Sequence, residues 1–278
     1  MKVPLGGAVA ARAAAVAAGE EPAVPLEPAA TVVLVRPTAD GGVEAYVQRR
    51  HRGLAFAGGV YAFPGGRVDP ADADLPDGLW GGPSPAEWAR RFAEADESQA
   101  RAHVAGLVRE LYEETGVLLA QGSPRLPAES DRVAVAEGRR HLREVLQAHG
   151  LRVDTDVLTP WARWVTPRFE RRRFDAWFFL AALPRGQQPR VATAESHEGR
   201  WVRPAEAVAA AEAGEMPMLP PTWWTLRQVA EAATVEQAAA HPPPMVRYTV
   251  GWTRRDDEVL LVLPDDPDYP GLDPREGT

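Results

Sequence analysis

The sequence predicts a single α/β domain. Segments with the composition of β-strands stand both before and after one long amphipathic helix, and no internal repeat divides the chain. A length of 278 residues is compatible with one large domain or two. Because 45% of the residues are apolar and nine are tryptophan, the chain can bury a sizeable core. One domain that joins the strands on both sides of the helix is the most economical arrangement.

Strands are predicted where β-branched and aromatic residues gather between turn residues. The candidate strands occupy residues 31–36, 43–50, 60–63, 161–166, 174–183, 198–203, 245–253 and 258–263. The turn Asp40-Gly41-Gly42 joins the first two into a hairpin. Residues 254–257 join the last two in the same way.

Helices are predicted from capping residues and apolar periodicity. The candidate helices occupy residues 8–18, 84–95, 98–115, 130–148, 204–214 and 220–240. The second of them begins with Ser84-Pro85-Ala86-Glu87, the order of an N-cap, a proline at the first helical position and a capping-box acid. Gly116 stands where a C-cap glycine ends the third.

The ends of the chain differ from its middle in composition. Residues 1–30 are rich in Ala and Pro, and we expect a mobile arm there, followed by the domain over residues 31–264 and an irregular tail over residues 265–278. The apolar run near the start is interrupted by Pro4, two glycines and Arg12, so we do not interpret it as a signal peptide. No segment approaches ~18 consecutive apolar residues. We therefore expect no contact with a membrane and a cytoplasmic location.

The composition also excludes several classes of function. The chain has no cysteine, which excludes disulfides, thiol nucleophiles and thiolate zinc sites. Its six histidines show no paired spacing typical of metal ligands. A net charge of −8 disfavours a general nucleic-acid-binding role, although it leaves room for a local basic pocket.

Three glutamates lie within one turn of the third helix. Glu110, Glu113 and Glu114 stand at i, i+3 and i+4, so their carboxylates share one stripe. The neighbouring face is apolar and predicted to be buried, through Val104, Leu107, Val108 and Leu111. Acids on an amphipathic helix usually form a solvated face. Held together beside a buried face, however, they present the oxygen ligands that Mg²⁺ or Mn²⁺ prefers.

Other residues around the glutamates favour the metal site. Arg109 precedes Glu113 by four residues and can brace its carboxylate. The Gly65-Gly66 turn follows a candidate strand, so its backbone N–H groups could approach a ligand closely. With these residues the sequence resembles the Nudix box, Gly-x5-Glu-x7-Arg-Glu-(apolar)-x-Glu-Glu-x-Gly-(apolar). The second half matches throughout, at Arg109, Glu110, Leu111, Glu113, Glu114, Gly116 and Val117.

The resemblance to the Nudix hydrolases implies a fold and an activity. The fold is an α/β/α sandwich with a mixed β-sheet, here with helical insertions. The activity is hydrolysis of the diphosphate of a nucleoside diphosphate linked to another moiety, with Mg²⁺ or Mn²⁺ held by Glu110, Glu113 and Glu114. The expected partner is therefore a small-molecule substrate of the nucleoside-diphosphate type. Association into a homodimer is left open. A catalytically silent Nudix domain that binds a nucleotide-like ligand is the alternative.

The first half of the box departs from the pattern. Its first acid falls on Asp72 in place of the longer Glu, and residues 73–108 intervene before Arg109 where the pattern has seven. We interpret residues 73–97 as an insertion and predict that they form a surface excursion outside the metal site. A split box with Phe-Pro-Gly-Gly-x-x-Asp before the break resembles the branch that includes the peroxisomal coenzyme A diphosphatases. Coenzyme A, acyl-CoA, ADP-ribose, NADH and diadenosine polyphosphates stay open as substrates.

Two segments after the helix are candidates for contacts with substrate. One loop contains four arginines, Arg168, Arg171, Arg172 and Arg173. We predict that Arg171 and Arg172 bind a phosphate of the substrate. The alternative is a basic loop that is simply solvated. In Nudix enzymes the catalytic base often comes from a loop on the far side of the sheet. The segment Glu195-Ser196-His197-Glu198 is at about that place. Glu198 is the predicted base, and a structural salt bridge is the alternative for either glutamate.

Overall fold

The computed structural model describes residues 3–4, 7–53, 57–92, 96–123, 125–255, 258–267 and 269. Within these residues the main sheet has eight strands. They are β2 (Leu26–Pro37), β3 (Val43–Arg50), β4 (Tyr61–Ala62), β5 (Gly65–Arg67), β9 (Leu158–Val165), β10 (Arg173–Ala182), β11 (Ser196–Val202) and β12 (Arg247–Thr249). Six of them follow the order β11-β3-β2-β10-β9-β12, while β4 pairs with β3 and β5 pairs with β2. The sheet is mixed, because β10 runs parallel to β2 and antiparallel to β9.

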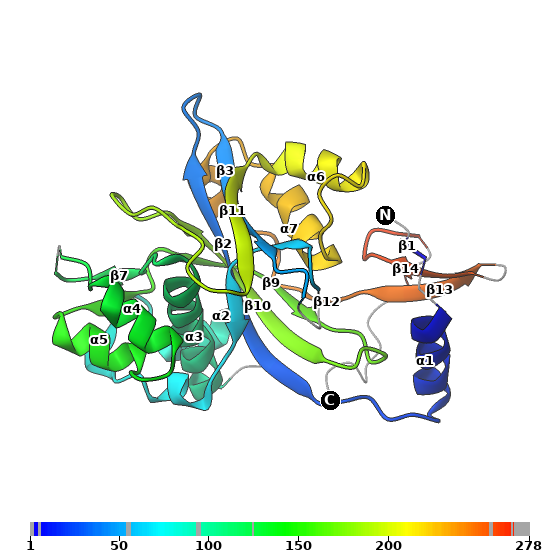
Figure 1. Ribbon diagram of the computed structural model, residues 1–278, viewed down its shortest axis with the longest axis horizontal. Helices are drawn as coiled ribbons and strands as arrows, with labels where there is room; N and C mark the ends of the chain where they lie inside the picture. The colour runs from blue at the N-terminus through cyan, green and yellow to red at the C-terminus, as the bar shows by residue number, and fades with distance from the viewer. Residues whose placement is uncertain are drawn as a thin grey trace.

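Helices cover both faces of this sheet (Figure 1). They are α2 (Pro85–Arg91), α3 (Glu97–Thr115), α4 (Glu129–Ala136), α5 (Leu142–Ala148), α6 (Pro204–Glu212), α7 (Pro220–Val229) and α8 (Val235–Ala240). A further helix, α1 (Gly7–Ala18), lies at one end of the molecule. The first face packs against α2–α5 and the second against α6–α8, each through its own apolar cluster. The predicted α/β/α sandwich with a mixed sheet is thereby confirmed. Among the described residues, no helix is long and apolar enough to cross a membrane.

The central pair β2 and β10 explains why both faces are buried. Their parallel register runs over ten residues, from Leu26 opposite Arg173 to Val35 opposite Ala182. Alternate side chains point to opposite faces of a strand. Val32 and Leu34 accordingly join the cluster under α3, whereas Val33 joins the cluster under α7. The predicted start of this strand at residue 31 is five residues late, because pairing with β10 extends it through Pro28 and two alanines that disfavour strands on their own.

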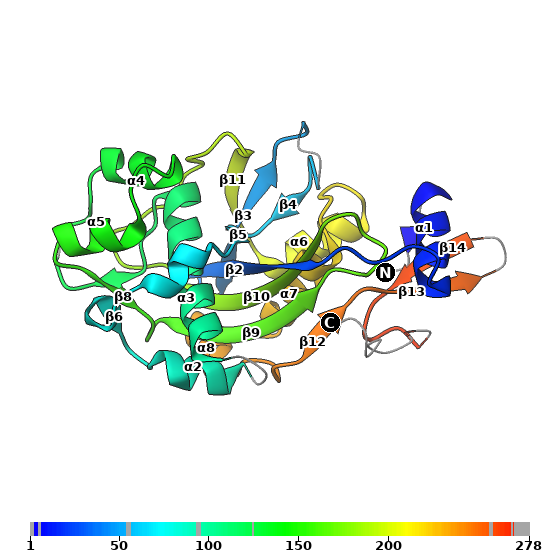
Figure 2. The same cartoon turned by 90° about the horizontal axis from the view of Figure 1, so that it is seen from below.

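The first thirty residues are largely regular structure. Ala13 and Val16 of α1 are buried, and Arg12 donates a hydrogen bond to the carbonyl oxygen of Phe169 (2.7 Å). β1 (Val3–Pro4) pairs with β14 (Glu258–Val262), which also pairs with β13 (Gly251–Arg255). Figures 1 and 2 show this small sheet and α1 together at one end of the molecule. The domain boundary expected at residue 30 therefore falls inside β2. Most of the irregular tail expected over residues 265–278 lies outside the described residues.

Three other predicted elements have different bounds. The helix expected over residues 130–148 is divided into α4 and α5 by a turn at Gly138, whose φ is +67°. The helix expected over residues 220–240 is divided into α7 and α8. The strand expected over residues 245–253 is also two elements, because β12 pairs with β9 in the main sheet while β13 pairs with β14. Alanines continue across the second break and Val250 across the third, so periodicity alone did not reveal them. The first break has no apolar residue, and Gly138 was the signal available there.

The segment expected to form a surface excursion is part of the core. It contains two short 3₁₀ helices, η1 (Pro70–Asp74, which begins before it) and η2 (Asp77–Leu79), then β6 (Trp80–Gly81) and α2. β6 and β7 (Ala120–Gln121) both pair with β8 (Arg152–Asp154) in a third sheet. Trp88 and Phe92 are buried under α3. The prediction of an excursion is therefore wrong for the described residues 73–92; residues 93–95 lie outside the described part.

An aromatic stack fixes this segment to the sheet. The Phe92 ring lies on one side of Trp177 in β10, with ring centroids 4.1 Å apart and an interplanar angle of 18°. The ring of His103 from α3 also stacks on Trp177, at 3.9 Å and 14°. Nδ1 of His103 is hydrogen-bonded to the carbonyl oxygen of Gln99 (2.7 Å). The end of α2, the first half of α3 and the distant strand β10 meet in this stack, so its loss would loosen all three together.

We expect acid to destabilise the protein partly through His103. Burial lowers the pKa of its imidazole, more than the hydrogen bond to Gln99 and the charge of Asp175 raise it. The unfolded chain therefore takes up a proton near pH 6.5 while the folded chain does not, and stability falls as the pH drops below that value. Thermal melting at pH 7.5 and 5.5 should show a smaller pH-dependent loss for His103→Gln than for wild type. Equal losses would assign the acid sensitivity to other groups.

Candidate active site

The local sequence sets both ends of α3. Asp96 is the N-cap, and its carboxylate accepts a hydrogen bond from the backbone N–H of Gln99 (2.7 Å), whose side chain in turn accepts from the N–H of Asp96. The helix thus begins one residue before the predicted start at Ser98. Gly116 ends it in the left-handed conformation, with φ of +76°, and confirms the predicted C-cap. Between these caps the apolar face is buried, so the stripe of glutamates is held in a fixed orientation beside it.

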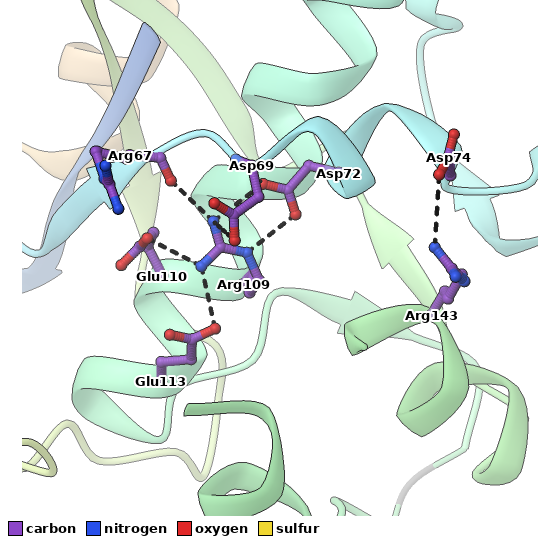
Figure 3. Close-up of polar contacts among 8 residues, drawn as sticks. All are labelled: Arg67, Asp69, Asp72, Asp74, Arg109, Glu110, Glu113 and Arg143. Atoms are coloured by element: carbon purple, nitrogen blue, oxygen red, sulfur yellow. Dashed lines mark hydrogen bonds and ion pairs between the residues drawn. The ribbon is translucent and has the colours of Figure 1, made fainter. Parts of the chain in front are cut away.

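Arg109 connects the two halves of the split box (Figure 3). Its guanidinium donates to both carboxylate oxygens of Asp72 (3.0 Å each) and to the carbonyl oxygen of Arg67 (2.8 Å). It also donates to Glu110 (2.9 Å) and Glu113 (3.1 Å). Burial acts to lower the pKa of Arg109, but these carboxylates outweigh it and raise the pKa. Asp72 therefore does contribute to the site, as the anchor of the arginine that braces two glutamates.

The two glycines of the turn let the backbone meet the helix. The N–H of Gly65 donates to Oε2 of Glu114 (3.0 Å). Gly65 has φ of +148°, and a Cβ there would lie 2.3 Å from the carbonyl oxygen of Ala30. A Cβ on Gly66 would lie 2.6 Å from the carboxyl carbon of Glu110. The turn thus packs against Glu110 and Glu114 at a distance that only glycine permits.

The three glutamates are crowded and short of positive charge. Burial raises the pKa of Glu114 to about 8, with a further increase from Glu110 and a partial offset from the N–H of Gly65. Burial also raises the pKa of Glu110 to about 7, against the lowering effect of Arg109, and raises the pKa of Glu113. Buried carboxylates of this kind are stabilised in the charged form by a bound cation. The donor set, which is oxygen only, suits Mg²⁺ or Mn²⁺.

The side chains are not arranged as a closed metal cage. Within the described part of the chain, no three acidic, histidine or cysteine side chains are gathered closely enough to hold a metal ion as they stand. The reason is visible in Figure 3, where one terminal nitrogen of Arg109 lies between the carboxylates of Glu110 and Glu113. Metal binding would therefore require these carboxylates to exchange part of their contact with Arg109 for the cation.

A second group of charged residues faces Glu114 from the sheet. Glu195, just before β11, forms an ion pair with Arg50 at the end of β3 (3.8 Å). The charge of Glu195 raises the pKa of Glu114, and that of Arg50 lowers it. Glu198 is engaged elsewhere, because it accepts a hydrogen bond from the hydroxyl of Tyr61 (3.1 Å) and lies 4.0 Å from Arg200. Of the two glutamates in this segment, Glu195 is thus the one with electrostatic contact to the box.

Residues on β3 complete this side of the site, and the site residues predicted from the sequence did not include them. Tyr46, Gln48 and Arg50 alternate along the strand and so share the face that carries α3. Burial raises the pKa of the Tyr46 hydroxyl to about 12, and the charge of Glu114 adds to the effect. A Cβ on Gly199 would lie 2.0 Å from this hydroxyl, so the glycine makes room for it. The two-residue period from Tyr46 to Arg50 was the available signal.

The arginine cluster of the β9–β10 loop lies away from the glutamates. Arg173 is buried and donates to the carbonyl oxygens of Thr166 (3.1 Å) and Val24 (3.0 Å), a structural role. Arg171 and Arg172 are exposed. In the register of the sheet, Arg173 is opposite Leu26, four residues from the Ala30 that is opposite Gly66. The loop is thus roughly 13 Å along β2 from the glycine turn. Phosphate binding by Arg171 and Arg172 stays a prediction.

Comparison with known proteins identifies relatives of this chain. The model of the NUDT19 Nudix domain matches residues 82–229, which is more than half of the chain. Putative nudix hydrolase 7 from Caenorhabditis elegans is 28% identical over 178 residues, which are 63% of this chain and 52% of that protein. Human acyl-coenzyme A diphosphatase NUDT19 is 31% identical over 147 residues, which are 46% of this chain and 39% of that protein. The chain thus spans about half or less of the length of these relatives.

Among solved structures, a NUDIX hydrolase from Alicyclobacillus acidocaldarius is similar over most of the chain. The TM-score is 0.70 at 29% sequence identity, and the match covers 80% of this chain and 98% of that one. Together with the family match, this similarity confirms the resemblance that was drawn from the split box.

Proposed function

Since this chain belongs to the Nudix hydrolase family, we propose that it is a metal-dependent pyrophosphohydrolase. Its substrate would be a nucleoside diphosphate linked to another moiety. The observation that carries the proposal is the complete Arg-Glu-x-x-Glu-Glu set on α3, with three crowded carboxylates of which Arg109 braces two. A domain that only binds a ligand has no need to keep these mutually repelling acids, which disfavours the catalytically silent alternative.

Glu110, Glu113 and Glu114 would hold the Mg²⁺ or Mn²⁺. When bound, the metal would neutralise the charge of the diphosphate and lower the pKa of a water molecule that attacks phosphorus. Arg109 holds Glu110 and Glu113 on the same side of the helix through its contacts to both. The N–H of Gly65 orients Glu114, and Gly66 leaves space for Glu110. These contacts fix the donor atoms before substrate binds, which limits the entropy lost on binding.

Two glutamates, Glu195 and Glu198, are the candidates for the general base of this mechanism. Glu198 was predicted from its order in the chain, and its contact with Tyr61 does not bring it to the box. The electrostatic contact between Glu195 and Glu114 favours Glu195 for this role. Its partner Arg50 would then hold its carboxylate in place. The two glutamates are three residues apart, so each serves as the matched control for the other when replaced by glutamine.

Coenzyme A or an acyl-CoA is the substrate that we favour. The similarity to a human protein named as an acyl-coenzyme A diphosphatase supports this choice, as does the split form of the box. ADP-ribose, NADH and diadenosine polyphosphates are the competing substrates, since each also contains a phosphoanhydride linked to a nucleoside.

The test is a substrate panel with the purified chain. We expect release of a 4′-phosphopantetheine product from coenzyme A with Mg²⁺ or Mn²⁺ and no release with a chelator. Under the same conditions Glu195→Gln should lower kcat by about 10²-fold or more, while Glu198→Gln should retain most of it. The reverse order would assign the base to Glu198. No metal-dependent hydrolysis of any diphosphate in the panel would contradict the proposed function.

A further inference from the structure

A basic turn lies beside the box, on the side away from the sheet. It consists of the connection from α4 to α5, Gly138, Arg139, Arg140 and His141, together with the first two residues of α5, Leu142 and Arg143. Gly138 turns the chain with φ of +67°. Arg140 is held in this turn by ion pairing with Asp131 (2.5 Å) and by a hydrogen bond to the carbonyl oxygen of Glu144 (3.2 Å). The turn is therefore a defined piece of structure and not a loose loop.

A small cavity separates the basic turn from the box. Its volume is about 120 Å³, and its lining includes Asp72, Arg109 and Glu113 on one wall and Arg140, His141 and Arg143 on the other. At ~30 Å³ per water molecule it has room for roughly four waters, which is the scale of one phosphate group. Pockets for whole ligands are usually about 300 Å³ or larger. The cavity therefore suits one group of a substrate whose remainder lies over the glutamates.

The two walls of the cavity differ in whether their charged side chains already have hydrogen-bond partners. On the box side, the carboxylates of Asp72 and Glu113 are already bonded to Arg109. On the other side, Arg143 is only loosely held, because Nη1 lies 3.9 Å from Asp74 and has no hydrogen-bond partner among the described residues (Figure 3). A guanidinium in this state can donate to a phosphate at full strength.

We propose that the basic turn binds a phosphate monoester of the substrate that is separate from the scissile diphosphate, with Arg143 as its main contact. The substrate class is a nucleoside diphosphate that carries an additional phosphate group on its ribose. This inference rests on the proposed function for the position of the diphosphate at the glutamates. It assigns the additional phosphate to Arg143, which lines a cavity with Glu113, instead of to Arg171 and Arg172 on the distant β9–β10 loop.

The experiment is calorimetric binding of two probes to the full chain in the presence of Mg²⁺. Adenosine 3′,5′-bisphosphate carries the additional phosphate, and adenosine 5′-monophosphate lacks it; neither contains a diphosphate to be hydrolysed. We expect Arg143→Gln to raise the Kd of the bisphosphate by about tenfold or more, and that of the monophosphate by less than twofold. Arg143→Lys keeps the charge and should retain part of the affinity. Thermal melting checks that each variant is folded.

Arg139 provides the matched control. It lies in the same turn but is exposed and pairs with Glu137, so Arg139→Gln should change neither Kd. The inference is overturned if wild type does not prefer the bisphosphate, if Arg143→Gln weakens both probes equally, or if Arg171→Gln/Arg172→Gln reproduces the selective loss instead. Selective binding without hydrolysis of any diphosphate would reject the proposed function and leave the phosphate subsite supported.

Discussion

Replacing Glu114 with glutamine is expected to reduce metal-dependent turnover by roughly two orders of magnitude or more, with little change in melting temperature. Glu114 is buried and accepts a hydrogen bond from the N–H of Gly65. The amide oxygen of glutamine can still accept that bond, so the turn should keep its position. The amide lacks the negative charge, however, and would be a far weaker ligand for a hard divalent cation.

The measurement combines steady-state kinetics with thermal melting. Glu97→Gln is the matched control, since Glu97 is on the same helix, is exposed, and has only a loose ion pair with Arg101 (3.5 Å). That variant should differ little from wild type in both rate and stability. Turnover by Glu114→Gln at a near wild-type rate would reject Glu114 as a metal ligand.

The second large effect concerns the segment between the halves of the box. Replacing residues 73–97 with a Gly/Ser linker should abolish the cooperative unfolding transition. The segment buries Leu75, Trp80, Trp88 and Phe92 in the cluster under α3. Removal of one large aromatic side chain from a core costs about 3–5 kcal/mol, and a whole domain is stable by only about 5–15 kcal/mol. The loss of the three aromatic side chains together, about 9–15 kcal/mol, is as large as the stability of a whole domain.

A single substitution tests the same packing more gently. Phe92→Ala should lower the free energy of unfolding by about 3–5 kcal/mol, because it leaves a cavity in the core and removes one of the two rings that stack on Trp177. Arg90→Ala, on the exposed side of α2, should change stability by no more than about 0.5 kcal/mol. A well-folded linker variant that retains metal-dependent hydrolysis would return the segment to the surface role first predicted for it.

Local patterns predicted the parts of this protein that local interactions determine. The glutamate stripe and its Gly116 cap, the Asp40-Gly41-Gly42 hairpin and the glycine turn all follow from residues within a few positions of one another. For the same reason β3 has the predicted bounds, residues 43–50. These features could be predicted without knowledge of the rest of the chain.

Long-range packing decided what could not be predicted. Trp88 of α2 and its C-cap Phe92 are four residues apart, which suggests a buried face. Their aromatic partners on β10, Phe179 and Trp177, come more than 80 positions later in the sequence. The β9–β10 arginines lie far from the glutamates because of the register between β10 and β2, which no local pattern reveals. The choice between Glu195 and Glu198 depends on which of them the pairing of β11 with β3 brings near Glu114. Residues 138–143 were not recognised as basic site residues because their position beside α3 is also a tertiary feature.

The bond between Arg109 and Asp72 closes a loop, since the two residues are 37 positions apart in the sequence. The entropy lost on closing a flexible loop grows only with the logarithm of its length, so doubling the loop adds about 0.6 kcal/mol. Extra residues in exposed parts of this connection would thus hardly disturb the geometry of Glu110 and Glu113. Relatives can therefore differ widely in the length of this connection, provided that the aromatic anchors on α2 keep the returning chain in place.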